Sequence, residues 1–260
     1  MPATDAQIEE ARQLLQGDFG RELARIALGA AFPILMIWQD DAGRSVFANG
    51  TGFIMRTPSA LIGVTADHVL AEYFDRRASG TDIYSQIAGQ RVNWEDRIIA
   101  RSPSRDIATF RMDGLSSISL GNFVKFPLET WPPVEPSMGQ GVVYGGYPGA
   151  ERELVQSDTI SYGSYAGSSM VDAVHRSEFV SVIEPESSVV AHPVGGQLPD
   201  EIQFGGMSGG PALAIVHTGE LVHFALMGVL TQGSALLRTC RFSRADAIQA
   251  DGTIDDAANF

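Results

Sequence analysis

The spacing of hydrophobic residues along this chain changes near residue 32. Over residues 3–28, apolar side chains recur close to the helical period, and the glycines within 17–20 predict a break between two helices. After Phe32, short apolar or alternating runs are separated by glycine, proline and polar residues, a pattern typical of strands. The sequence therefore predicts an N-terminal helical arm at 1–31, followed by an all-β region.

Two sets of candidate strands follow, separated by a connection rich in proline and glycine. The first set lies at 33–39, 45–56, 60–65, 83–89, 92–100 and 106–112, and the second at 140–146, 153–164, 178–184, 188–192, 210–217 and 222–231. Because about six antiparallel strands can close a small barrel, the sets predict two six-stranded barrels at 32–113 and 138–242, with a linker at 114–137. A C-terminal helix and tail at 243–260, with Ser243 as helix N-cap, completes the prediction.

The composition indicates a folded protein and argues against two classes of binding partner. Hydrophobic residues make up 44% of the 260 positions and charged residues 19%, so a packed core is expected. Acidic residues outnumber basic ones 31 to 18, the net charge is −13, and no basic cluster stands out, so nucleic acid and anionic membrane are not expected partners. The acidic first residues do not resemble a signal peptide, and the apolar run 26–38 contains Pro33 and is too short to span a membrane. A soluble, cytoplasmic location is therefore expected.

The single cysteine, Cys240, rules out a disulfide within the chain and favours a reducing compartment. It has no metal-ligand pattern around it, and we expect it to be a buried packing residue. The histidines His175, His192, His217 and His223 also lack metal-ligand spacing. The sequence therefore predicts no metal and no other cofactor.

One serine stands in a turn built mostly of glycine. The segment 205–211 reads Gly-Gly-Met-Ser-Gly-Gly-Pro, with Ser208 at its centre. A serine hydroxyl becomes a nucleophile when a base takes its proton, and the oxyanion formed on attack needs preorganised donors. Glycines let the backbone approach a substrate carbonyl closely. Upstream, His68 is a candidate base and Asp106 a candidate partner for it, with Asp96 and Asp75 as alternatives on spacing alone.

Five short segments together resemble the trypsin-like serine protease superfamily. They are Gly50-Thr51-Gly52-Phe53-Ile54, Thr65-Ala66-Asp67-His68-Val69, Asp106-Ile107-Ala108, Gly206-Met207-Ser208-Gly209-Gly210-Pro211 and Gly228-Val229-Leu230. The order His68, Asp106, Ser208 is that of the double β-barrel proteases. Over residues 32–240 the similarity is to bacterial disulfide-free members, such as the catalytic domains of HtrA-like proteases, here without a PDZ domain.

The resemblance implies a serine endopeptidase that cleaves protein or peptide substrates. His68 would act as general base and acid, Asp106 would orient it, and Ser208 would be the nucleophile. The N–H groups of Gly206 and Ser208 would form the oxyanion hole. Asp67, beside His68, is expected to be an exposed neighbour.

Two departures from trypsin itself modify this prediction. Met207 stands where trypsin has the aspartate that pairs with a new N-terminus, so latency would come from loop ordering or from a regulatory partner bound through residues 1–30. The arm would otherwise be a helical pad packed on a barrel. The specificity pocket would be lined by Ile202, Leu230, Thr231 and Gly233. These residues predict a preference for a small or medium apolar P1 residue, the residue before the cleaved bond.

Other functions compete with the protease reading. The pattern Gly206-x-Ser208-x-Gly210 also matches the nucleophile elbow of α/β-hydrolase esterases, although that fold places its aspartate and histidine after the serine. A protease-like fold could also serve as a catalytically silent binding or scaffold module. A third possibility is an enzyme held inactive until a partner or another protease releases it.

Overall fold

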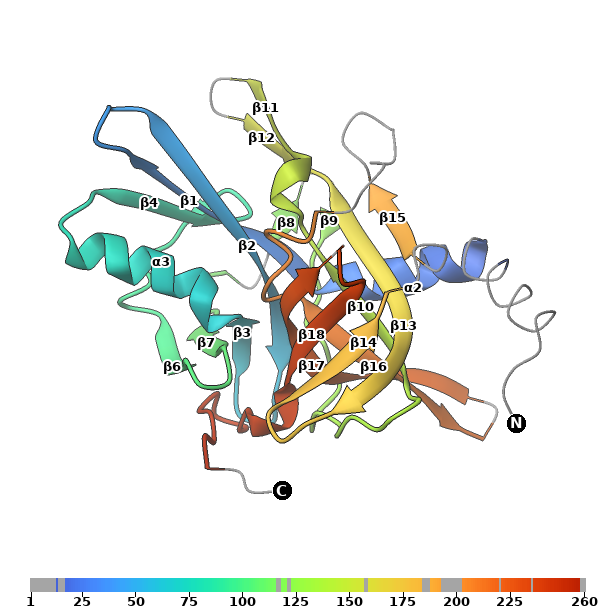
Figure 1. The fold of residues 1–260 in the computed structure, drawn as a ribbon. Coiled ribbons are helices and arrows are strands. Elements are labelled where there is room, and N and C mark those ends of the chain that lie inside the picture. The colour runs from blue at the N-terminus through green and yellow to red at the C-terminus, as the bar shows by residue number, and fades with distance from the viewer. Residues whose placement is uncertain are drawn as a thin grey trace.

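The computed structural model describes residue 13 and residues 17–115, 118–120, 123–156, 159–183, 188–192, 203–219, 221–234 and 236–257. Within these ranges the elements are mainly β-strands, and the strands form two large sheets. Two longer helices accompany them, α2 (Asp18–Gly29) and α3 (Asp67–Ala78). Figure 1 shows α3 beside one sheet and α2 against the other. No helix in this part of the chain is both long and apolar enough to cross a membrane.

The first sheet contains seven strands in the order β5-β4-β1-β2-β3-β7-β6. They are β1 (Ala31–Gln39), β2 (Ser45–Arg56), β3 (Leu61–Thr65), β4 (Ile83–Ile87), β5 (Gln90–Arg91), β6 (Ile98–Ser102) and β7 (Ile107–Arg111). Neighbouring strands run antiparallel. In the described residues the outer strands β5 and β6 do not pair with each other, so strand pairing does not close this set into a barrel.

Strand β2 shows how the sequence pattern sets this packing. Its second half is buried on both faces, because alternate residues enter different cores. Ile54 packs into the core enclosed by the first sheet, whereas Phe53 and Met55 pack into the core between the two sheets. The continuous apolar run of this strand thus reflects a position between two cores.

The second sheet closes on itself. Its strands are β10 (Gly141–Gly146), β13 (Ser164–Val174), β14 (Glu178–Val182), β15 (Ser188–His192), β16 (Pro211–Thr218), β17 (Leu221–Ser234) and β18 (Thr239–Arg244). The order is β10-β16-β17-β18-β14-β13, and β13 pairs back with β10, while β15 adds to β13. This confirms one closed six-stranded antiparallel barrel. The antiparallel pairing also excludes the mainly parallel sheet of an α/β-hydrolase.

The interior of the barrel is aromatic and apolar. Phe179 and Phe242 stack with ring centroids 4.9 Å apart, and Tyr144 packs on Phe242 at 5.4 Å. Cys240 is fully buried in the same core, and burial raises the pKa of its thiol to about 12. The prediction that Cys240 is a buried packing residue is confirmed.

The predicted C-terminal helix is wrong. Ser243 belongs to strand β18, and in the described residues after it, which end at 257, the only helical element is the short 3-10 turn η4 (Ala245–Ala247). Cys240 and Phe242 point into the barrel while Arg241 lies outside, so this segment has the period of a strand and fills the gap between β14 and β17. Tertiary pairing thus overrides the helical propensity of the alanines.

Several other boundaries differ from the prediction. The segment 92–100, predicted as one strand, instead contains a loop that carries the buried Trp94 and leads into β6. The segment 153–164, also predicted as one strand, is mainly a hairpin of β11 (Arg152–Gln156) and β12 (Thr159–Tyr162). Strands β13 and β18 were not predicted. The predicted linker includes the short strands β8 (Ser119–Leu120) and β9 (Phe123–Val124).

Helix α2 is a pad on the barrel, one of the two roles considered for the arm. Leu23, Ala24, Ala27 and Leu28 form a buried face that packs with Val143 and Ala166 of the barrel. The helix begins at Asp18, within the predicted break. Gln13 is helical, and the rest of the predicted first helix lies outside the described residues.

Candidate active site

His68 lies in the first turn of α3, directly after buried strand β3. The neighbouring Asp67 is buried and accepts two hydrogen bonds from Arg101, at 2.6 Å from Nε and 3.0 Å from Nη2. The expectation that Asp67 is exposed is therefore wrong. A carboxylate at a helix N-terminus is favoured by the helix dipole, and the paired Arg101 also lies over the ring of Phe74. This pair ties the start of α3, and with it His68, to strand β6.

Asp106 is the carboxylate that holds His68. Its Oδ2 lies 2.7 Å from His68 Nδ1, and its Oδ1 accepts the His68 backbone N–H at 2.8 Å. Since a carboxylate only accepts, Nδ1 is the donor of this bond, and in the neutral form of the ring Nε2 has the lone pair that can act as a base. Asp96 instead accepts a hydrogen bond from Asn93. The backbone of Asp106 has a φ of 52°, a costly left-handed conformation of the kind that clusters at functional sites.

The segment around Ser208 is a tight turn anchored in the barrel. Met207 is fully buried in the barrel core, so the residue before the serine fixes the turn by packing. The N–H of Met207 donates to Phe204 O at 2.9 Å, and the N–H of Gly210 donates to Met207 O at 3.0 Å. The N–H of Gly209 donates across to Leu230 O of strand β17 at 2.7 Å.

The three remaining N–H groups of this turn, those of Gly205, Gly206 and Ser208, donate to no group among the described residues. The Gly205 carbonyl accepts the Gly149 N–H at 2.6 Å. Because C=O and N–H point in opposite directions across a trans peptide, the Gly206 N–H points away from Gly149. Gly206 has a φ of 96°, and an added Cβ would overlap the side chain of Asn49 and lie 2.7 Å from Gly149 N. Only glycine fits this position without strain.

Ser208 is half-buried, and its hydroxyl donates to Thr231 O at 3.1 Å. Within the described part of the chain, no hydrogen bond joins Ser208 to His68. The turn nevertheless lies close to the start of α3, because Ala66 N is 2.9 Å from the position that a Cβ on Gly209 would take. The Ser208 hydroxyl is thus bonded to the carbonyl of Thr231, and Thr231 lines the same pocket as His68.

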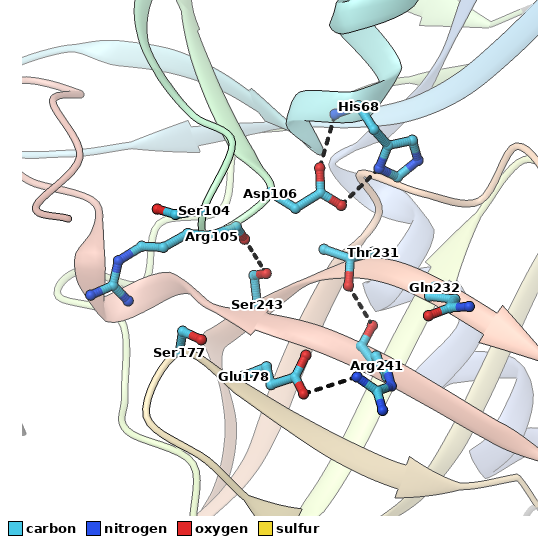
Figure 2. A pocket seen from close by; sticks show the side chains of 10 residues that line it. All are labelled: His68, Ser104, Arg105, Asp106, Ser177, Glu178, Thr231, Gln232, Arg241 and Ser243. Carbon is cyan, nitrogen blue, oxygen red and sulfur yellow. Dashed lines mark hydrogen bonds and ion pairs between the residues drawn. The ribbon is translucent and has the colours of Figure 1, made fainter.

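This hollow, here called the polar hollow, has a volume of about 350 Å³ and lies between the two sheets (Figure 2). It is lined by His68, Ser104, Arg105, Asp106, Ser177, Glu178, Thr231, Gln232, Arg241 and Ser243. Figure 2 shows Asp106 directly beside His68, and the ion pair of Glu178 with Arg241 farther from His68. The Arg241 Nη1 lies 3.1 Å from Glu178 Oε1. The lining offers charges of both signs rather than an apolar surface.

The predicted specificity residues have separate positions. Ile202 lies outside the described residues. Leu230 is only 1% exposed and packs in the barrel core, so it contacts the serine turn through its carbonyl. Thr231 lines the polar hollow. Gly233 is covered by the ring of Phe204, which a Cβ at this position would overlap.

Sequence reasoning missed Asn49, Thr51 and Phe204 as residues around the serine turn. Asn49 and Thr51 lie in β2, far from Ser208 in the chain, and only the packing of the two sheets brings them to the turn. The Gly50-Thr51-Gly52 motif was one available signal, since a polar residue between glycines in a buried strand needs a hydrogen-bonding partner.

The chain matches no family model, and no curated protein proved similar enough to count as a relative. In the described residues, no group of three or more His, Cys, Asp and Glu side chains is placed to hold a metal ion. The case for function therefore depends on the geometry of these side chains.

Proposed function

We propose that this protein is a serine endopeptidase that cleaves peptide bonds through Ser208, His68 and Asp106. The observation that carries the proposal is the combination of a His68–Asp106 pair at 2.7 Å with unused N–H groups on Gly206 and Ser208, the residues on either side of Met207. Each element alone has structural explanations. Together they supply a base, a carboxylate that orients it, and two donors for the developing oxyanion. The two donors flank Met207, whose buried side chain fixes the turn.

Acylation would begin when the Ser208 hydroxyl turns from Thr231 O toward His68. Such bonds are often absent or poorly aligned without substrate. Ser208 Oγ attacks the carbonyl carbon of the scissile peptide, its proton passes to His68 Nε2, and the carbonyl electron pair moves to the oxygen. The N–H groups of Gly206 and Ser208 stabilise that oxyanion. Its collapse breaks the C–N bond, and the leaving amine takes the proton from His68.

Deacylation repeats these steps with water. His68 removes a proton from the water as its oxygen attacks the acyl ester, and the oxyanion again lies at the Gly206 and Ser208 N–H groups. The ester C–O bond then breaks, and Ser208 Oγ recovers the proton from His68. Asp106 remains an anion throughout and stabilises the protonated ring.

The substrate is proposed to lie between the first sheet and the barrel, which in this reading is the second of two barrels of the trypsin-like kind. The proposed preference for a small or medium apolar P1 side chain is supported by Phe204, which packs on Gly233 and limits the space beside strand β17. The polar hollow would receive the substrate next to His68 and offer it Glu178 and Arg241. Its polar lining favours peptides over apolar esters.

The proposal is tested by incubating the protein with a peptide library and identifying cleaved bonds by mass spectrometry. We expect cleavage after small or medium apolar residues, abolished by Ser208→Ala. Ser177→Ala is the matched control, because Ser177 lines the same hollow and its side chain has no hydrogen-bonding partner among the described residues. Ser177→Ala should retain activity within about 3-fold. A clear preference for Arg, Lys or Glu at P1 would contradict the specificity but not the reaction.

The alternative is a catalytically silent binding module with the same fold. It predicts that no peptide is cleaved, and that Ser208→Ala and wild type bind the same peptides equally well. Cleavage that survives Ser208→Ala would indicate a contaminating protease and would contradict the assignment of that cleavage to Ser208.

A further inference from the structure

We infer that Thr51 is a positioning residue for the oxyanion turn, an inference that rests on the proposed function and extends it. Thr51 lies in strand β2 and is fully buried. Its backbone N–H donates to Ser208 O at 2.8 Å, and its hydroxyl donates to Gly206 O at 2.8 Å. One residue of the first sheet thus holds the carbonyls of both residues whose N–H groups are proposed to bind the oxyanion.

The Thr51 hydroxyl is used in both directions. While it donates to Gly206 O, it accepts the Tyr147 N–H at 2.9 Å. Tyr147 O in turn accepts a hydrogen bond from Asn49 Nδ2 at 3.1 Å, and Asn49 Oδ1 accepts one from Arg152 at 2.9 Å. These bonds connect the serine turn to the 147–149 turn, whose Gly149 N–H holds Gly205 O.

The consequence concerns the two peptide planes on either side of the Gly206 Cα. The Gly149 N–H fixes the peptide plane between Gly205 and Gly206 by bonding the Gly205 carbonyl. The Thr51 hydroxyl fixes the plane between Gly206 and Met207 by bonding the Gly206 carbonyl. With both planes held, φ and ψ of Gly206 are determined. Glycine otherwise changes the sign of φ at little cost. A flipped first plane would present a carbonyl oxygen, not an N–H, to the oxyanion. By accepting the Tyr147 N–H, the Thr51 hydroxyl also holds the turn whose Gly149 N–H fixes this first plane, and it thereby opposes loss of the donor.

The side chain is separable from the backbone in this role. Any residue other than proline at position 51 keeps the N–H that bonds Ser208 O. Thr51→Ser keeps the hydroxyl and loses a methyl group, whereas Thr51→Val keeps the shape and leaves Gly206 O and the Tyr147 N–H without this partner. A buried unpaired group favours rearrangement of the turn.

The test is the second-order rate constant for inactivation by diisopropyl fluorophosphate, whose phosphoryl oxygen takes the place of the oxyanion. Thr51→Val should react about 10- to 100-fold more slowly than wild type, and Thr51→Ser within about 3-fold. The pH midpoint of inactivation should be the same in all three proteins, because the His68–Asp106 pair is unchanged. In a Gly206→Ala background, Thr51→Val should cause no further loss, since the turn is already displaced.

A purely structural role for the hydroxyl would lower the melting temperature of Thr51→Val and leave its inactivation rate equal to that of wild type, and this result would overturn the inference. If Thr51→Val does not melt cooperatively, Thr51→Ala replaces it, with the same expected loss. A wild-type protein that diisopropyl fluorophosphate does not inactivate would overturn the proposed function itself.

Discussion

Gly206 combines a backbone conformation that favours glycine with a proposed role as an oxyanion donor. It has positive φ, and a Cβ there would overlap Asn49. Its neighbour Gly205 has no positive φ, and among the described residues no atom lies within 4 Å of the position that an added Cβ would take. The two adjacent glycines therefore form a matched pair, one required by geometry and one not.

Gly206→Ala should reduce peptide cleavage about 10²- to 10³-fold, because the displaced turn removes an oxyanion donor. It should also lower the free energy of unfolding by about 1–3 kcal/mol, the cost of a strained residue. Gly205→Ala should change cleavage less than about 3-fold and stability by no more than about 0.5 kcal/mol. Steady-state rates and urea unfolding of both variants check this. Equal losses in the two variants would contradict the assigned roles.

At this scale the sequence predicts residue types better than their contacts. His68 and Asp106 were selected from motif and spacing, and the structure places them in contact. The alternatives Asp96 and Asp75 could be discarded only with the fold, because spacing does not show which carboxylate turns toward a ring. The roles of Asp67 and Thr51 depend on Arg101 and on the turn around Ser208, which are distant in sequence. No local pattern contains these pairings.

Among the elements, the end of helix α2 is held in part by a buried amine from the connection between the two sheets. Lys125, the only lysine in the chain, follows strand β9 and is 7% exposed. Its Nζ donates to Leu28 O near the end of α2 at 2.9 Å and lies 5.5 Å from the centre of the Tyr147 ring. Burial lowers the pKa of Lys125 to about 8.

Lys125 should make stability depend on pH in one direction. Between the folded pKa of about 8 and the ordinary value of 10.5, the unfolded chain binds more protons at this site, so stability rises with pH in this window. Below about pH 8 the amine is charged in both the folded and the unfolded state, and the full cost of desolvating it lowers the free energy of unfolding. The free energy of unfolding of wild type should therefore rise relative to Lys125→Met from pH 8 to 10.5, by at most about 3 kcal/mol.

The titration itself has a direct readout. With one lysine, the ¹³Cε signal of labelled protein reports Lys125 alone, and its midpoint should lie near pH 8. A midpoint near 10.5, together with unfolding free energies of wild type and Lys125→Met that change in parallel with pH, would contradict a buried, desolvated amine.

The prediction of elements succeeded for strands with an apolar face along their whole length. It failed for strands whose position is determined by pairing with their neighbours. Strands β1, β2 and β3 follow the predicted ranges closely. Strand β18 was missed, and its last two residues were placed in the predicted helix because alanines follow them. Strand β13 was missed because its glycine and serines hide the alternation of apolar and polar residues. Both strands are specified by their neighbours in the closed barrel.

For the whole molecule, the arrangement of two sheets matters more than either sheet alone. A core that includes Phe53, Val64, Leu213 and Val229 lies between them, and the C-terminal residues Ala245 and Ile248 belong to it. The tail continues along the first sheet, where Thr109 Oγ1 donates to Gly252 O at 2.5 Å. Helix α3 and the turn before β7 supply His68 and Asp106, strand β2 supplies Thr51, and the turn before β16 of the barrel supplies Ser208. The proposed chemistry therefore requires the two sheets to keep their packing against each other.

The most direct measurement is the intact mass of the native protein after treatment with a fluorophosphonate, followed by peptide mapping. A serine endopeptidase with this site should gain one adduct, on Ser208, while protein unfolded in urea, or carrying Ser208→Ala, should gain none. Ser177→Ala should label as wild type does. An unmodified native protein, or an adduct on a serine other than Ser208, would contradict the proposal that Ser208 is an activated nucleophile.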